Sequence, residues 1–156
     1  MIKKITLIIL GIFLYSCGFT PMLKNFDFSK INIEEIKYSG PNDMTYLLKN
    51  YLDINEKKGS QGIFIDLSIS ENTSSANKNT AGITIEEDLV ITINIEIKDN
   101  NNNNLLKDSI FDSKRLTVSS NISANQEIKK IERDNIIRNL AQKTKFQIQL
   151  IANQNK

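Results

Sequence analysis

The feature that most constrains the fold is a two-residue alternation between Thr84 and Lys98. Aliphatic side chains occupy every second position there, namely Leu89, Ile91, Ile93, Ile95 and Ile97. The positions between them are mostly polar, as at Thr92, Asn94 and Glu96. Successive side chains of a strand point to opposite faces of a sheet. The segment therefore predicts a long strand in an antiparallel sheet with one apolar face and one wet face.

Weaker alternation elsewhere predicts the rest of the sheet. Three further strands are expected, at residues 31–39, 63–70 and 105–120. The phase of the alternation changes near Glu34-Glu35, which predicts a bulge in the first of them. The polar residues 71–82 form either a long loop or an extension of the strand before them. The asparagine run at 99–104 is typical of a hairpin tip.

Helical periodicity appears in two places. After a turn at Gly40-Pro41, with Asn42 or Asp43 as cap, apolar residues share one helical face, namely Met44, Leu47, Leu48, Tyr51 and Leu52. This helix should end by about Asn55. A second helix is expected from a capping box at Ser123 to Gln126 until about Ala152. Its apolar stripe comprises Ile128, Ile131, Ile137, Leu140, Ala141, Thr144, Ile148 and Ile151.

The order of these elements predicts an α+β fold. Consecutive hairpin strands combined with two helices indicate a two-layer sandwich. Its sheet is mostly antiparallel and four-stranded, with both helices on one face. We expect residues 31–156 to form a single domain of this kind.

The first twenty residues have the pattern of a secretory leader. Lys3 and Lys4 precede an apolar run, Ile5 to Phe13, which is shorter than the ~20 residues that span a bilayer as a helix. Leu14-Tyr15-Ser16-Cys17 then looks like a bacterial lipobox. We therefore expect a signal peptide at 1–16, lipidation of Cys17 and a lipidated tether at 17–30. Since Gly18 follows the cysteine instead of aspartate, the general sorting rule indicates the periplasmic side of the outer membrane.

Composition excludes several kinds of site. The chain has no His, and its single Cys is the one in the lipobox. Catalytic sites of the Ser-His-Asp or Cys-His type and zinc sites built on Cys or His are therefore excluded. The formal net charge of +2 is matched by the two leader lysines, so the mature domain has no global charge that attracts nucleic acid. No catalytic residue and no cofactor is predicted.

Three groups of charged residues remain as candidate sites. Glu86-Glu87-Asp88 is a carboxylate cluster, but its members alternate along a strand and converge poorly on a metal ion. Lys107, Lys114 and Arg115 have few matching acids nearby apart from Asp108 and Asp112, and are candidates for an anionic ligand. The last helix carries interleaved cations and acids, the pattern of a solvated face. Its cations are Lys129, Lys130, Arg133, Arg138, Lys143 and Lys145.

The start of the mature chain suggests a family. Cys17-Gly18-Phe19-Thr20-Pro21-Met22 resembles the first residues of the LptE family of lipopolysaccharide-assembly lipoproteins, especially its alphaproteobacterial branch. Leu140-Ala141 also resembles part of that family's last helix. The usual glycine soon after the proline is replaced by Lys24 and Asn25.

The resemblance implies that the protein catalyses no reaction. A family member forms a complex with the β-barrel LptD, plugs it and assists lipopolysaccharide assembly at the cell surface. Lys107, Lys114 and Arg115 would then contact lipid A phosphates. Two other classes of protein stay open on the residues alone: an outer-membrane lipoprotein that binds a small ligand or peptide, and an envelope hydrolase that uses carboxylates only.

Overall fold

The computed structural model describes residues 31–59 and 62–154. The predicted leader, the lipidation site Cys17 and the tether lie outside the described residues. The elements in chain order are β1 (Ile33–Ser39), α2 (Asn42–Leu52), β2 (Ile63–Lys78), β3 (Thr84–Lys98), β4 (Asn104–Thr117) and α3 (Ile122–Gln154). Among these residues, no helix combines the length and the apolar character needed to cross a bilayer.

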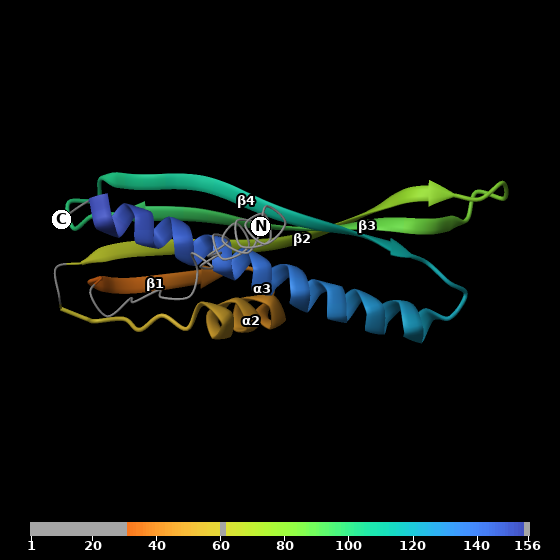
Figure 1. The fold of residues 1–156 in the computed structure, drawn as a ribbon, viewed down its shortest axis with the longest axis horizontal. Helices are drawn as coiled ribbons and strands as arrows, with labels where there is room; N and C mark the ends of the chain where they lie inside the picture. Colours follow the sequence, from red (N-terminus) through yellow and green to blue (C-terminus); the bar gives the residue numbers. More distant parts are fainter. Residues whose placement is uncertain (1–30, 60–61, 155–156) are drawn as a thin grey trace, which may run out of the picture.

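The predicted α+β architecture is confirmed. The four strands lie in the order β1-β2-β3-β4, with β1 parallel to β2 and the other neighbours antiparallel. The parallel pair needs a crossover, and α2 supplies it. Figure 1 shows α2 and α3 as one layer and the sheet as the other, with α3 running obliquely along the sheet.

The core lies between the sheet and the two helices. All five alternating aliphatic residues of β3 are buried, as predicted, and Ile65, Leu67 and Ile69 of β2 lie beside them. From α2 the core receives Met44, Leu48 and Leu52. From α3 it receives Ile136, Ile137, Leu140, Ala141, Thr144 and Ile148. The Thr144 hydroxyl is satisfied because it donates to the Leu140 carbonyl oxygen at 2.9 Å.

The predicted apolar stripe of α3 is wrong at its first turns. Ile128 and Ile131 are 45% and 52% exposed, so they belong to the surface and not to the core. Burial on α3 begins at Ile136, where the helix lies against the sheet and α2. Helical periodicity identifies a face of a helix, but it does not tell how far along that face a sheet extends.

Strand boundaries follow pairing more than hydrophobicity. The pairing of β1 with β2 shifts between Ile33 and Glu35, which confirms the predicted bulge. β2 continues to Lys78, so residues 71–78 are a strand extension and not a loop. This extension pairs with the first half of β3, and the tip of the resulting ribbon projects beyond the helices in Figure 1. Because hydrogen bonds with β3 hold it, it needs no apolar face of its own.

Both predicted helix caps are wrong. Pro41 precedes α2 and no side chain caps that helix, while Asp53 ends it in the left-handed region at φ 43°. At α3 the cap is Asn121 in place of Ser123, since Asn121 Oδ1 accepts from the Ala124 backbone N–H at 3.1 Å. Asparagine and serine cap helices about equally well, so composition alone does not choose between them.

Candidate functional site

The sheet separates the three cations predicted to share an anionic ligand. Residues opposite each other on antiparallel strands share a face. Lys114 lies opposite Leu89 and therefore on the face that the helices cover, although its own side chain is exposed at the sheet edge. Lys107 lies opposite Glu96, and Arg115 opposite Asp88, both on the uncovered face. Eight positions of strand, about 26 Å, separate Lys107 from Arg115.

Arg115 has a partner that the sequence interpretation missed. Its Nε and Nη2 atoms donate to the two carboxylate oxygens of Asp88 at 2.8 and 3.0 Å. The hydrogen bond to Arg115 lowers the pKa of Asp88, and the same bond raises the pKa of Arg115. Asp108 and Asp112, which were the acids predicted to lie near Arg115, contact Gln147 and Lys143 of α3 instead. Only the strand register brings residues 88 and 115 together.

The carboxylate cluster at 86–88 diverges as predicted. Glu86 and Asp88 lie on the uncovered face, whereas Glu87 lies opposite Leu116 on the helix side. Glu86 accepts from the Asn77 amide, and Asp88 is engaged by Arg115. Within residues 31–59 and 62–154, no three Asp, Glu, His or Cys side chains are placed to hold a metal ion.

The cations of α3 do more than decorate a solvated face. Lys129 and Arg133 both reach Glu71 of β2, with Nζ–Oε1 3.3 Å and Nε–Oε2 2.5 Å. Arg133 also contacts Asp43 of α2 at 3.3 Å. The Glu71 side chain is only 16% exposed. These contacts therefore join α3 both to the sheet and to α2, and the prediction of an ordinary solvated face is wrong for these two cations.

A sequence signal for Glu71 existed. The alternation of Ile63, Ile65, Leu67 and Ile69 continues to position 71, so an extended strand places this carboxylate on the helix-covered face. Burial alone would raise the pKa of Glu71. The hydrogen bonds and charges of Arg133 and Lys129 together outweigh burial, and the net pKa is lowered.

The Glu71 contacts predict a pH-dependent stability. A carboxyl group whose pKa is lowered in the folded state stabilises the fold above its unfolded pKa of about 4.3. That stabilisation is lost as the pH falls through the lower folded pKa. Glu71→Gln should therefore reduce the free energy of unfolding by about 1–2 kcal/mol at pH 7, given its partial exposure.

Urea unfolding of both proteins from pH 7 to pH 2 measures this effect. The difference between them should shrink below about pH 4.3. Glu87→Gln is the matched control, because Glu87 forms no ion pair within the described residues. A difference between wild type and Glu71→Gln that stays constant down to pH 2 would contradict the assignment.

A second polar cluster ties α2 to α3. The Tyr51 hydroxyl donates to Asp134 Oδ1 at 2.6 Å, and Arg138 Nη2 contacts Asp134 Oδ2 at 2.9 Å. The Arg138 guanidinium also lies 5.2 Å from the centre of the Tyr51 ring. This combination of hydrogen bonds and a cation–π contact fixes the distance between the two helices.

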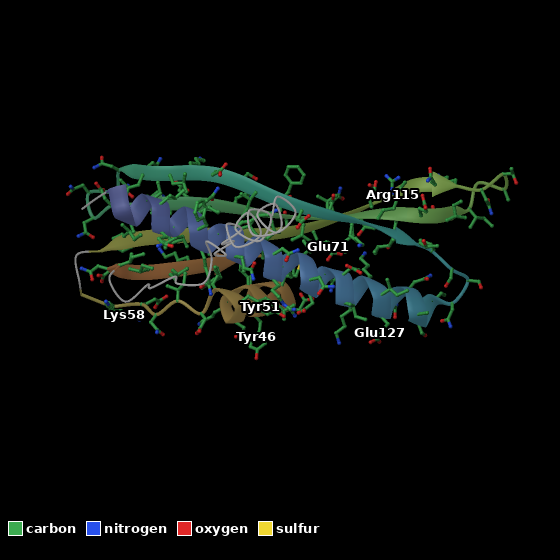
Figure 2. The ribbon with its side chains drawn as sticks, viewed as in Figure 1. Tyr46, Tyr51, Lys58, Glu71, Arg115 and Glu127 are labelled. Carbon is green, nitrogen blue, oxygen red and sulfur yellow. The ribbon has the colours of Figure 1, made fainter. Side chains whose placement is uncertain are left out.

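A groove of about 790 Å³ lies beside this cluster, between α2 and α3. Two exposed apolar side chains line it, Tyr46 at 67% and Ile131 at 52% exposure. Charged residues surround them, among them Glu127, Lys130 and Arg138. Figure 2 shows Tyr46 and Tyr51 on α2 and Glu127 on the first turns of α3. The groove suits an amphipathic segment or a small ligand with both apolar and polar parts.

Two further hollows flank β4. One of about 700 Å³ lies between α3 and β4 and is lined by Ile110, Lys143 and Phe146, among others. The other, about 390 Å³, lies on the uncovered sheet face, where Asp66, Glu96 and Lys107 meet. The second contains carboxylates beside its only cation, so it offers no concentrated positive charge for a phosphate.

Comparisons with known proteins place the fold among bacterial lipoproteins. No protein-family model matches the chain, and no curated protein matches it. The structure of rare lipoprotein B from Shewanella oneidensis is similar, with a TM-score of 0.61 and 11% identity over 78% of this chain and 98% of that one. A minor lipoprotein from Acinetobacter baumannii gives a TM-score of 0.59 and 18% identity over 79% and 92%.

A third similar structure is lipoprotein B from Nitrosomonas europaea. It gives a TM-score of 0.58 and 12% identity over 76% of this chain and 83% of that one. At these identities the likeness concerns the fold. The matched part covers 83% or more of each of these three neighbours.

Proposed function

We propose that this chain is a lipid-anchored lipoprotein on the periplasmic side of the outer membrane, where it binds the β-barrel LptD and assists lipopolysaccharide assembly. It acts by binding and catalyses no reaction. The observation that carries the proposal is that a lipobox-like leader precedes a fold shared with several bacterial lipoproteins. The Cys-Gly-Phe-Thr-Pro sequence after the leader narrows the proposal to the LptE family.

The surface of the domain supports a binding role inside a polar barrel. The uncovered sheet face is mostly polar, with Ser68, Ser70, Thr92, Asn94 and Ser109 along its strands. The lumen of a large membrane barrel is polar as well. The sheet is long and covered by helices on one face only. Its polar uncovered face therefore suits contact with a water-filled barrel interior.

The test is a mild-detergent pull-down of the full-length lipidated protein from its own envelope. A large outer-membrane β-barrel at equal stoichiometry is expected, identified by mass. Gentle salt washing should not release it if the contact buries a sizeable surface. A protein recovered alone would contradict the proposal.

A ligand-binding lipoprotein is the second candidate, and the groove between α2 and α3 favours it. That groove exposes Tyr46 and Ile131 in a hollow of ligand size. If the pull-down yields no barrel, native mass spectrometry of the purified protein should show a bound small molecule. Tyr46→Ala should then weaken its binding, whereas Tyr46→Phe should retain most of it.

Lys107 and Lys114 are proposed as separate contacts to lipopolysaccharide, since they lie on opposite faces of the sheet. Within the described residues, Lys107 and Lys114 form no ion pair, whereas Arg115 is bound to Asp88. Reversing the charge of Lys107 and Lys114 together should weaken binding of purified lipopolysaccharide at least threefold, as expected for two exposed phosphate contacts of a few tenths of a kcal/mol each. Arg115→Glu alone is the comparison, and it should also disturb the strand pair with Asp88.

The affinity of each variant is measured by its binding to immobilised lipopolysaccharide at a fixed salt concentration. Far-UV circular dichroism of each variant shows whether the sheet is intact. Unchanged affinity of the Lys107 and Lys114 variant would remove both residues from the proposed lipopolysaccharide contacts without affecting the barrel proposal.

A further inference from the structure

The two edge strands of the sheet, β1 and β4, differ in whether another segment covers their outer edge. The outer edge of β1 is covered by the chain that follows α2, because Lys57 N–H donates to the Ile33 carbonyl oxygen at 2.8 Å. The Ile36 N–H donates to Glu56 Oε1 at 3.0 Å on the same edge. No described segment pairs with the outer edge of β4, which is 14 residues long. An uncovered edge of this length is a template for another strand.

One hydrogen bond shows which backbone N–H groups of β4 face β3 and which face the open edge. Val118, directly after β4, donates its N–H to the Ile85 carbonyl oxygen of β3 at 2.8 Å. Backbone N–H groups alternate between the two edges of a strand. The even-numbered N–H groups of β4 therefore face β3, and the odd-numbered ones, including those of Ser109 and Ser113, face the open edge.

Aspartate side chains occupy these two outward donors. The Ser109 N–H donates to Asp108 Oδ1 at 2.8 Å, and the Ser113 N–H donates to Asp112 Oδ1 at 2.9 Å. Each serine follows its aspartate directly. The same Asp-Ser pair, four residues apart, thus closes two positions of one strand edge.

Helix α3 holds both aspartates. Gln147 Nε2 donates to Asp108 Oδ2 at 2.5 Å, and Lys143 Nζ lies 3.9 Å from Asp112 Oδ2. Lys143 and Gln147 are one helical turn apart and face the same way. In each aspartate one oxygen contacts the helix and the other accepts from the strand edge. The position of the caps is therefore set by how α3 packs on the sheet.

We propose that Asp108 and Asp112 are caps that keep the outer edge of β4 from pairing with β4 of a second copy of this chain. A two-fold antiparallel pair centred on Phe111 would bring Ser109 of one copy opposite Ser113 of the other. Those residues would exchange backbone hydrogen bonds. The caps occupy these very donors in both copies, so the paired arrangement is closed while they are in place.

The side chains around this centre favour a second copy as the occupant. Phe111 is 66% exposed on the uncovered face, and the two copies of it would meet at the centre of the pair. On the other face Asp108 would lie opposite Lys114 of the second copy. Lys107 would lie opposite Arg115, a like-charge pair whose repulsion is lessened because Asp88 already binds Arg115. This inference does not depend on the proposed partner barrel.

The test is the mass of the lipidated full-length protein in detergent, measured by light scattering that separates protein from detergent. Wild type should be a single chain. The double variant Asp108→Ala and Asp112→Ala should show a concentration-dependent doubling of protein mass. A double variant that stays at one chain over the same concentrations would overturn the proposal.

The control variant is Asp66→Ala with Glu96→Ala. It also removes two carboxylates from the sheet, and both contact Lys98. They lie on inner strands whose backbone groups are paired on both sides, so this variant should remain a single chain. Mass doubling in the control would show that lost charge, and not an opened edge, causes association.

Two further variants distinguish capping from charge and from unfolding. Asp108→Asn with Asp112→Asn removes the charges but retains the Oδ1 acceptors, so it should remain a single chain. Adding Ser113→Pro to the double alanine variant removes an outward donor that the pair needs, and should restore the single chain. If the double alanine variant unfolds, Asp112→Ala alone should still show partial doubling, and its absence would overturn the proposal.

Discussion

Replacing Cys17 with serine is expected to abolish the proposed lipidation of this protein, and with it the proposed attachment to the outer membrane. The thiol is the attachment point for the diacylglyceryl group in the lipobox reading, and no other cysteine is present to replace it. Each buried methylene of an acyl chain contributes about 0.8 kcal/mol to membrane binding, so losing several chains removes essentially all of the affinity. Palmitate labelling of cells and fractionation of their envelopes measure both effects.

The matched control is Ser16→Ala, which keeps a small residue directly before the cysteine. This variant should be labelled and should remain in the outer-membrane fraction. Palmitate label on the Cys17→Ser protein would contradict lipidation at this position. An unchanged amount of the Cys17→Ser protein in the outer-membrane fraction would contradict it as well. Such a result would also withdraw the main support for an envelope lipoprotein.

Replacing Gly40 with alanine is expected to destabilise the described domain strongly. Gly40 joins β1 to α2 at φ 131°, a conformation that residues with a side chain rarely adopt. An added Cβ would lie 2.2 Å from the Ile69 carbonyl oxygen of β2. Strain and overlap together should lower the free energy of unfolding by roughly 2–5 kcal/mol.

Gly82→Ala is the matched control for this prediction. Gly82 also has a positive φ, 79°, but an added Cβ there would meet no atom within 4 Å. Its cost should be limited to about 1–2 kcal/mol for the left-handed backbone. Urea unfolding followed by circular dichroism measures both variants. Equal losses for the two would show that close packing against Ile69 is unimportant.

The sheet and its core are the parts that local pattern predicts best. The alternation of β3 fixed which side chains are buried, because a strand has only two faces and one of them must leave water. The bulge in β1 was visible for the same reason, since it shifts the phase of the alternation. The helix face of α2 was equally clear, with Met44, Leu48 and Leu52 buried as expected.

Local sequence pattern does not predict which residues from distant parts of the chain contact each other. Arg115 was predicted to lack a partner other than Asp108 and Asp112, yet the register of β3 with β4 places it on Asp88. Lys107 and Lys114 looked like one site with it and instead lie on opposite faces. The odd spacing of Lys107 and Lys114 along one strand already places them on opposite faces. Which acid lies opposite Arg115 depends instead on the register between β3 and β4, which the two strands and their turn set together.

The sequence by itself determined the order of the elements, the α+β class and the residues of the buried sheet face. These depend on the periods of 2 and 3.6 residues, which are properties of the local backbone. Only the tertiary structure decided where α3 crosses the sheet. That crossing buries Ile136 but exposes Ile131, binds Arg133 to Glu71, and holds Asp108 and Asp112 over the edge of β4. Each of these contacts joins segments far apart in the chain, so its energy depends on packing that no local pattern contains.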